Sequence, residues 1–86
     1  MTAAERMRVA VASLGEEPTD RFLDFVRLCE LLGYDAVFHA DEKWTRDVYV
    51  QLGGAAAVTN RIGLGMSVTD PFTRHPGLTA QATATL

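Results

Sequence analysis

Two groups of polar side chains follow two strand-like runs, at the points where those runs end. Asp41 and Glu42 come just after the run that ends at His39, and the segment VTDPFTRHP, residues 68–76, follows the run that starts at Ile62. A strand that leads through Asp-Pro and His-Pro into a helix is where an α/β barrel usually carries its chemistry. Because the carboxyl ends of parallel strands share one rim, we expect both groups to line one pocket.

A metal site is one alternative for these polar residues. His39, Asp41, Glu42 and His75 could be drawn together on the rim, but their spacing matches no common ligand pattern, so no metal is expected. His39 lies two residues before Asp41 and is expected to point into the barrel interior. A core histidine with satisfied ring nitrogens is the preferred interpretation of it.

Several rim residues also have a structural interpretation that competes with a functional one. Asp41 could cap the next helix or pair with a neighbouring cation, and Trp44 could pack at the rim or contact a substrate. Asp70 before a proline is typical of a turn. Arg74 is interpreted as a solvated or structural cation, and His75 as a helix N-cap.

The elements that must position these residues alternate between strand and helix periodicity. Strands are predicted over residues 8–13, 34–39 and 62–67, and helices over residues 19–32, 47–59 and 76–86. The order β-α-β-α-β-α with short connections favours parallel strands joined by right-handed helical crossovers. Both a barrel and an open doubly wound sheet have this order.

The first predicted helix has the clearest pattern. Its apolar residues recur at i, i+3 and i+4 while charged residues fill the opposite face. Cys29, the only cysteine, falls among the apolar positions and is interpreted as a core residue rather than a reactive thiol. Gly33 stands where a left-handed C-terminal cap is expected.

The second predicted helix contains Gly53 and Gly54, each of which costs about 1 kcal/mol relative to alanine in a helix interior. We expect these glycines and the following alanines to let the helix backbone lie close on a sheet. Pro76 begins the third helix, where a missing N–H is harmless.

The first strand-to-helix turn separates the two architectures. A dinucleotide-binding sheet would have G-x-G-x-x-G there, whereas this turn reads SLGEEPT, with one glycine and two adjacent carboxylates that would repel phosphate. Gly63 and Gly65 lie inside a predicted strand rather than after one. A (β/α)8 barrel is therefore favoured, although 86 residues are far fewer than the about 250 that such a barrel needs.

Composition narrows the class of protein. An apolar fraction of 48% and a charged fraction of 22% are typical of a globular protein and argue against disorder. The net charge is −3 and the basic residues are scattered, so neither nucleic acid nor a membrane is an expected partner. No stretch resembles a signal peptide or a transmembrane helix, and a cytoplasmic location is expected.

Two segments resemble a known family. ADEKWTRDVY, residues 40–49, and RIGLGMSVTDPFTRHPGLTA, residues 61–80, are similar to the amino-terminal part of the luciferase-like flavin and deazaflavin oxidoreductases, most closely the methylenetetrahydromethanopterin reductase-like branch. The resemblance implies that residues 1–86 are the N-terminal, incomplete part of a (β/α)8 barrel. It also implies hydride transfer or monooxygenation of a small-molecule substrate. Coenzyme F420 is the expected cofactor at the carboxyl-end rim, with FMN as the alternative.

The resemblance also implies roles for individual residues. Asp41 matches an aspartate beside the cofactor ring that helps to position cofactor and substrate. Glu42 stands where the family often has a histidine proposed as an acid or base, so Asp41 and Glu42 are the expected catalytic residues. Ser67 and Val68 match a non-prolyl cis peptide that backs the ring, and Thr69 is expected to contact the ring or its ribityl chain.

A chain of three strands would lack the phosphate-binding loops that commonly follow strands seven and eight of a barrel. It would also expose two unpaired sheet edges and apolar helix faces. We therefore expect the 86-residue chain alone to be inactive, and either to self-associate or to need the rest of a barrel. The alternative function is a non-catalytic α/β module that assembles with copies of itself or with a partner.

Overall fold

A computed structural model describes residues 6–86 of the chain. Its elements are β1 (Ala10–Ser13), α1 (Thr19–Leu31), β2 (Ala36–His39), α2 (Val48–Val58), β3 (Gly63–Met66) and α3 (Pro76–Thr85). All six predicted elements are present in the predicted order. Each strand is shorter than its predicted range.

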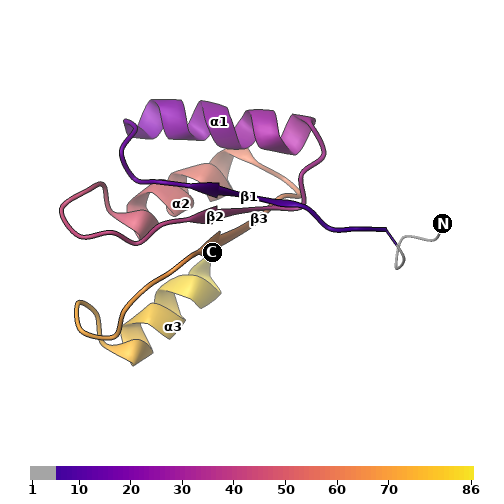
Figure 1. Ribbon diagram of the computed structural model, residues 1–86. Coiled ribbons are helices and arrows are strands. Elements are labelled where there is room, and N and C mark those ends of the chain that lie inside the picture. Colours follow the sequence, from indigo (N-terminus) through magenta and orange to yellow (C-terminus); the bar gives the residue numbers. More distant parts are fainter. Residues whose placement is uncertain (1–5) are drawn as a thin grey trace.

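The three strands form one parallel sheet in the order β1-β2-β3. Val37 of β2 stands between Val11 of β1 and Leu64 of β3 in the register. In Figure 1, α1 runs above the strands, α2 behind them and α3 below, and the loops that follow the three strands all lie at the left end. The parallel arrangement and the shared end of the three loops agree with the sequence prediction.

The start of β1 is shortened by a side chain. The Asp35 carboxylate accepts a hydrogen bond from the Val9 amide at 2.8 Å, while the Val9 carbonyl accepts one from the Asp35 amide at 2.8 Å. Arg6 donates two hydrogen bonds to the same carboxylate, at 2.5 and 3.2 Å. Because a carboxylate occupies the Val9 amide, the ladder between β1 and β2 begins one residue later, at Ala10.

Helix α1 ends in a Schellman motif, which sets where β2 begins. The Gly33 amide donates to the Glu30 carbonyl and the Tyr34 amide to the Cys29 carbonyl, both at 3.1 Å. Gly33 has φ +88°, a left-handed conformation that glycine adopts without a Cβ clash. The predicted glycine cap is confirmed, and the motif turns the chain before strand pairing starts at Ala36.

The core lies between the sheet and the helices α1 and α2. Its buried members are apolar residues of all three regions: Phe22, Val26, Cys29, Val37, Val48, Leu52, Ala55 and Ile62. Cys29 is 3% exposed, as predicted for a core residue. On the opposite face of the sheet Phe38 is 43% exposed. The sheet is therefore covered on one face only.

The two glycines of α2 do not have the expected role. A Cβ on Gly54 would stand 3.2 Å from Cδ2 of Leu23 on α1, and a Cβ on Gly53 would meet no atom within 4 Å. The close approach at Gly54 is thus between two helices, and the buried small residue of α2 is Ala55. The expectation that both glycines bring the helix close to the sheet was wrong.

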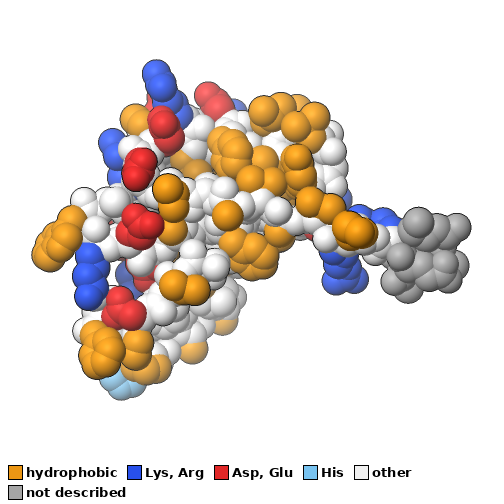
Figure 2. Space-filling view, viewed as in Figure 1, with side chains coloured by type: hydrophobic (Ala, Val, Ile, Leu, Met, Phe, Trp, Pro, Cys, Tyr) orange, Lys and Arg blue, Asp and Glu red, His pale blue; other side chains and the backbone are white. Residues whose placement is uncertain are grey.

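Among residues 6–86, no helix combines the length and apolar character that crossing a membrane requires. Figure 2 shows most acidic side chains of the visible face in its left half, toward the end that carries the strand-to-helix loops. The acidic side chains of this face thus gather toward the end at which the polar loops meet.

Candidate functional site

Backbone hydrogen bonds continue the sheet beyond the carboxyl ends of the strands. The Ala40 amide donates to the Ser13 carbonyl and the Ser67 amide to the His39 carbonyl, both at 2.9 Å. The first residues after β2 and β3 are therefore held in register. This places the chain after His39 beside the chain after Ser67, as predicted from the shared rim.

Asp41 meets the β3–α3 loop directly. Its amide donates to the Val68 carbonyl at 3.4 Å, and its carboxylate accepts a hydrogen bond from the Thr69 hydroxyl. The peptide bond between Ser67 and Val68 is cis, as the family resemblance led us to expect. Four of the predicted site residues, Asp41, Ser67, Val68 and Thr69, thus lie together.

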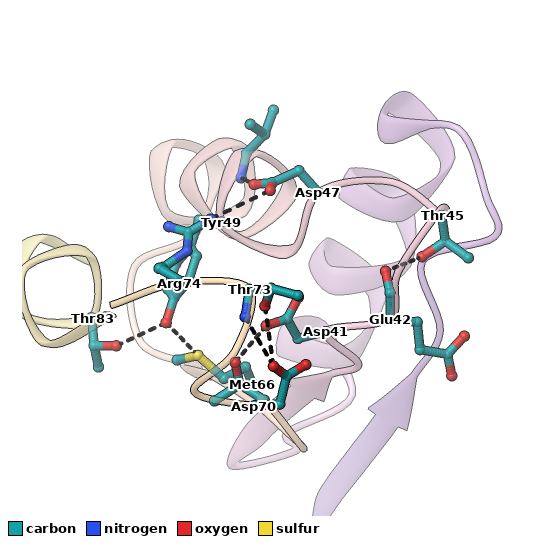
Figure 3. A network of polar contacts seen from close by, with 12 residues as sticks. Asp41, Glu42, Thr45, Asp47, Tyr49, Met66, Asp70, Thr73, Arg74 and Thr83 are labelled. Carbon is teal, nitrogen blue, oxygen red and sulfur yellow. Dashed lines mark hydrogen bonds and ion pairs between the residues drawn. The ribbon is translucent and has the colours of Figure 1, made fainter. Parts of the chain in front are cut away.

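Glu42 is placed differently from Asp41. Its backbone carbonyl accepts a hydrogen bond from the Thr45 hydroxyl at 3.0 Å, and its carboxylate extends away from Asp41 and Asp70 (Figure 3). Within residues 6–86 no hydrogen bond holds that carboxylate. The two adjacent carboxylates therefore do not face one another.

Asp70 shapes the turn that follows Thr69. Its Oδ1 accepts hydrogen bonds from the amides of Phe72 at 2.8 Å and Thr73 at 3.1 Å, and Lys43 Nζ lies 4.0 Å from its Oδ2. The Phe72 amide is the largest cause that lowers the pKa of Asp70 below its ordinary value. The interpretation of Asp70 as a turn residue is confirmed.

A hollow of about 220 Å³ separates the β2–α2 loop from the β3–α3 loop. The residues that line it include four acidic and two basic ones, Asp41, Glu42, Asp47, Asp70, Lys43 and Arg74. Larger hollows of about 540 Å³ beside β1 and about 460 Å³ between α2 and α3 contain none of the predicted site residues. The rim hollow contains Asp41 and Glu42 of the predicted site residues, whereas Thr69 lines a separate hollow of about 230 Å³ on the β3–α3 loop.

Arg74 ties the β3–α3 loop to the start of α2. Its guanidinium lies 4.4 Å from the centre of the Tyr49 ring and 3.5 Å from Asp47 Oδ1 (Figure 3). Asp47 caps α2 by accepting a hydrogen bond from the Val50 amide at 3.0 Å. The cap of α2 is therefore Asp47 and not Asp41. Arg74 is a structural cation, as predicted.

Tyr49 was missed by the sequence prediction. Its hydroxyl lies 3.2 Å from Thr83 Oγ1 and donates to Met66 Sδ, so one side chain joins α2, the end of β3 and α3. The sequence signal that could have identified Tyr49 is an aromatic residue two positions after the Asp47 cap.

His75 occupies the predicted N-cap of α3, with Nδ1 accepting from the Gly77 amide at 2.9 Å.

The predicted orientation of His39 was wrong. His39 is fully buried, but its ring stacks on Phe22 of α1 at 4.1 Å and therefore faces the helices rather than the barrel interior. The alternation along β2 explains this, because Val37 and His39 share the core face while Phe38 faces the other side. Trp44 is 99% exposed and lies among the residues that line the rim hollow, so of its two interpretations the substrate contact stays a prediction.

In the described part of the chain, residues 6–86, no three His, Cys, Asp or Glu side chains come close enough together to hold a metal ion. His75 caps α3 and the His39 ring is enclosed in the core, so neither joins the carboxylates of the rim.

Comparison with known proteins identifies a family and individual proteins to which this chain is similar. Residues 3–86 match the family model described as luciferase-like monooxygenase. A 5,10-methylenetetrahydromethanopterin reductase of Methanolobus tindarius is 34% identical over 80 residues, which are 93% of this chain and 24% of that protein. An F420-dependent glucose-6-phosphate dehydrogenase of Beutenbergia cavernae is 42% identical over 73 residues, covering 74% of this chain and 22% of that protein.

A solved structure has the same fold. The coenzyme F420 dependent tetrahydromethanopterin reductase from Methanopyrus kandleri matches with a TM-score of 0.89 and 26% identity, covering 93% of this chain and 23% of that one. The fold is therefore that of the N-terminal part of the reductase's (β/α)8 barrel, as the sequence predicted. The chain spans about a quarter of the length of the relatives that it matches.

Proposed function

The chain belongs to the luciferase-like monooxygenase family, and on that premise we propose that it forms part of the cofactor pocket of an F420-dependent oxidoreductase. The relatives named above, from Methanopyrus kandleri and Beutenbergia cavernae, are F420-dependent by name, which favours this deazaflavin over FMN. The reaction proposed for the whole protein is hydride transfer to or from a small-molecule substrate. When bound, the deazaflavin supplies the hydride-carrying ring carbon.

One observation carries the proposal: Asp41, Thr69 and the Ser67–Val68 peptide come together at the carboxyl-end rim. A flat ring needs a surface to lie on, and Val68 offers a side chain that is 80% exposed. Gly65, two residues before this peptide, makes room for the Phe38 ring of β2, because a Cβ there would stand 3.1 Å from that ring. These residues fit a planar cofactor.

In this proposal Asp41 and Thr69 orient the ligand. The Thr69 hydroxyl donates to Oδ2 of Asp41, which fixes the plane of the carboxylate and leaves Oδ1 to accept a hydrogen bond from a bound ring or substrate. Val68 and the cis peptide would press on one face of the ring. Positioning of this kind is the main demand of hydride transfer.

Glu42 is proposed as the proton donor or acceptor. It is among the residues that line the same rim hollow as Asp41, and its carboxylate extends away from Asp41 (Figure 3). A Glu42→Gln variant tests the role through the pH dependence of the rate: a rate that keeps its pH profile would remove Glu42 from the mechanism.

Binding is tested with the chain continued by the remaining part of the Methanopyrus kandleri reductase, here called the joined protein. It is titrated with F420 and with FMN, and binding is followed by absorbance and fluorescence. We expect F420 to bind, and Asp41→Asn to weaken binding by about tenfold, the loss of about 1.4 kcal/mol. Asp24→Asn is the matched control, because Asp24 lies on the exposed face of α1 and contacts only Arg27 at 3.9 Å.

Three results would contradict the proposal. Equal F420 affinity in the wild-type and Asp41→Asn joined proteins would place the ring elsewhere. If the joined protein bound FMN but not F420, the cofactor would be FMN and not the proposed deazaflavin. A folded joined protein that binds neither would leave the non-catalytic, self-associating module as the better account.

A further inference from the structure

A buried polar pair lies directly beneath the rim. His39 is 0% exposed and Gln51 1% exposed, and His39 Nε2 lies 2.6 Å from Gln51 Oε1. The other ring nitrogen, Nδ1, lies 2.7 Å from the Ser13 hydroxyl at the end of β1. Gln51 belongs to α2, so the pair joins the first and second strands to the second helix.

The remaining contacts of Gln51 fix the direction of its hydrogen bond with His39. Its Nε2 donates to the Glu17 carbonyl at 3.1 Å and to Thr19 Oγ1 at 3.2 Å. Because a backbone carbonyl only accepts, the amide nitrogen faces Glu17 and the amide oxygen faces His39. His39 Nε2 therefore donates to Gln51 Oε1, and its Nδ1 shares a hydrogen bond with the Ser13 hydroxyl. The two bonds hold the imidazole ring in one orientation.

This network reaches the proposed cofactor site through the backbone of His39. The His39 carbonyl accepts the Ser67 amide at 2.9 Å, and Ser67 begins the cis peptide with Val68. On the other side the network holds the carbonyl of Glu17 in the β1–α1 loop. One buried cluster thus fixes the ends of β1 and β2 and the loop after β3.

Stability alone does not require polar residues here. Buried polar groups are costly unless every hydrogen bond is made, and apolar side chains of similar volume often replace such groups without loss of stability. No buried side-chain polar atom in residues 6–86 lacks a partner, so the network is complete. Completed networks of this kind specify one arrangement of the surrounding backbone.

We infer that His39 and Gln51 are positioning residues that fix where Asp41 and the Ser67–Val68 peptide stand relative to the bound ring. The inference rests on the proposed function for the identity of that ring. It assigns no direct contact with cofactor or substrate to either residue. A displacement of about 1 Å at such a site can cost about 100-fold in rate.

The test uses the double variant His39→Leu/Gln51→Leu, which removes both partners together. In the 86-residue chain the melting temperature and the hydrogen exchange of the Ser67 amide are measured. We expect a melting temperature close to that of the wild type, with Ser67 exchange at least tenfold faster. The ¹⁵N spectrum of the wild-type imidazole should show a protonated Nε2.

In the joined protein the same double variant should bind F420 about tenfold more weakly and lose turnover more than it changes KM. Leu52→Met is the matched control, because Leu52 is a fully buried neighbour on α2 and the change keeps its volume. It should leave Ser67 exchange and F420 affinity unchanged. If the double variant does not fold, Gln51→Met takes its place in the same measurements.

Wild-type values for Ser67 exchange and F420 affinity in the folded double variant would overturn the inference. An unprotonated Nε2 in the wild type would also overturn it, because the bond to Gln51 would then be absent. Failure of the wild-type joined protein to bind F420 would instead contradict the proposed function. In that case the exchange rates and the imidazole spectrum of the 86-residue chain still decide whether His39 and Gln51 position the rim.

Discussion

The hydroxyl of Thr69 donates a hydrogen bond to the carboxylate of Asp41, across 28 positions of sequence. The bond connects the loops after β2 and β3 at the point where the Asp41 amide also meets the Val68 carbonyl. A carboxylate held in this way presents its second oxygen in a fixed direction. The orientation of Asp41 therefore depends on Thr69.

Thr69→Val should show this dependence in the joined protein. The change keeps the shape of the side chain but removes the donor, and a hydrogen bond of this kind contributes about 0.5–1.5 kcal/mol. We expect F420 affinity to fall by about threefold to tenfold, measured by fluorescence titration, while Thr69→Ser retains it. Equal affinities for the valine and serine variants would show that the hydroxyl does not orient Asp41.

Gly53 and Gly54 form a matched pair for testing helix packing. Gly53→Ala places its Cβ in open space and should stabilise the chain by about 0.5–1 kcal/mol, the gain of helix propensity. Gly54→Ala places its Cβ 3.2 Å from Leu23 Cδ2, and we expect this crowding to cancel that gain. Urea unfolding of both variants measures the difference, and an equal gain in the two would contradict the packing of α1 on α2.

The Asp35–Arg6 pair predicts a dependence of stability on pH. The hydrogen bond from Arg6, followed by that from the Val9 amide, lowers the pKa of Asp35 from 3.8 to about 2. Because the pKa is lower in the folded state, the stabilisation is present above pH 3.8 and is lost as the pH falls toward 2. Urea midpoints between pH 5 and pH 2 should therefore fall.

Arg6→Gln should make that fall shallower, since the carboxyl would lose its main partner. Arg21→Gln is the control, because Arg21 makes only an exposed contact of 3.8 Å with Glu17. Identical pH profiles for the wild type and Arg6→Gln would refute the assignment.

The open face of the sheet predicts self-association of the 86-residue chain. Phe38 is 43% exposed on the face opposite the core, and β1 and β3 are edge strands in the described structure. Sedimentation should detect species larger than a monomer, and Phe38→Lys should reduce them. Val50→Lys, on an exposed position of α2, serves as the control. A monomer with a cooperative melt would contradict this prediction.

Much of the fold could be predicted from sequence because periodicity and caps are local. The i, i+3, i+4 pattern identified the buried face of α1, and Gly33 identified its end. Strand ends were less accurate, because the Asp35 carboxylate that shortens β1 is 26 residues away from Val9. Glu30 is a similar case: it falls on the charged face of α1, yet its carboxylate accepts the amides of residues 60–62.

Part of the site could also be predicted. The parallel order of the strands is enough to predict that the loop with Asp41 lies beside the loop with Thr69, because both follow the carboxyl end of a strand. The face of the sheet on which His39 lies depends on which alternate positions of β2 point toward the core, and the sequence did not settle this. Its partner Gln51 lies on α2, and the apolar pattern of that helix gave no sign of a buried amide. The sequence therefore did not predict contacts that depend on which face of a strand a residue occupies, or on a partner far away in the sequence.

The most direct measurement is the mapping of amide chemical shifts in the ¹⁵N-labelled joined protein as F420 is added. If the ring lies against the cis peptide, the largest changes should occur at Asp41 and at residues 67–69, with little change beside β1. Largest changes around Phe22 and Phe25, at the hollow beside β1, would contradict the account.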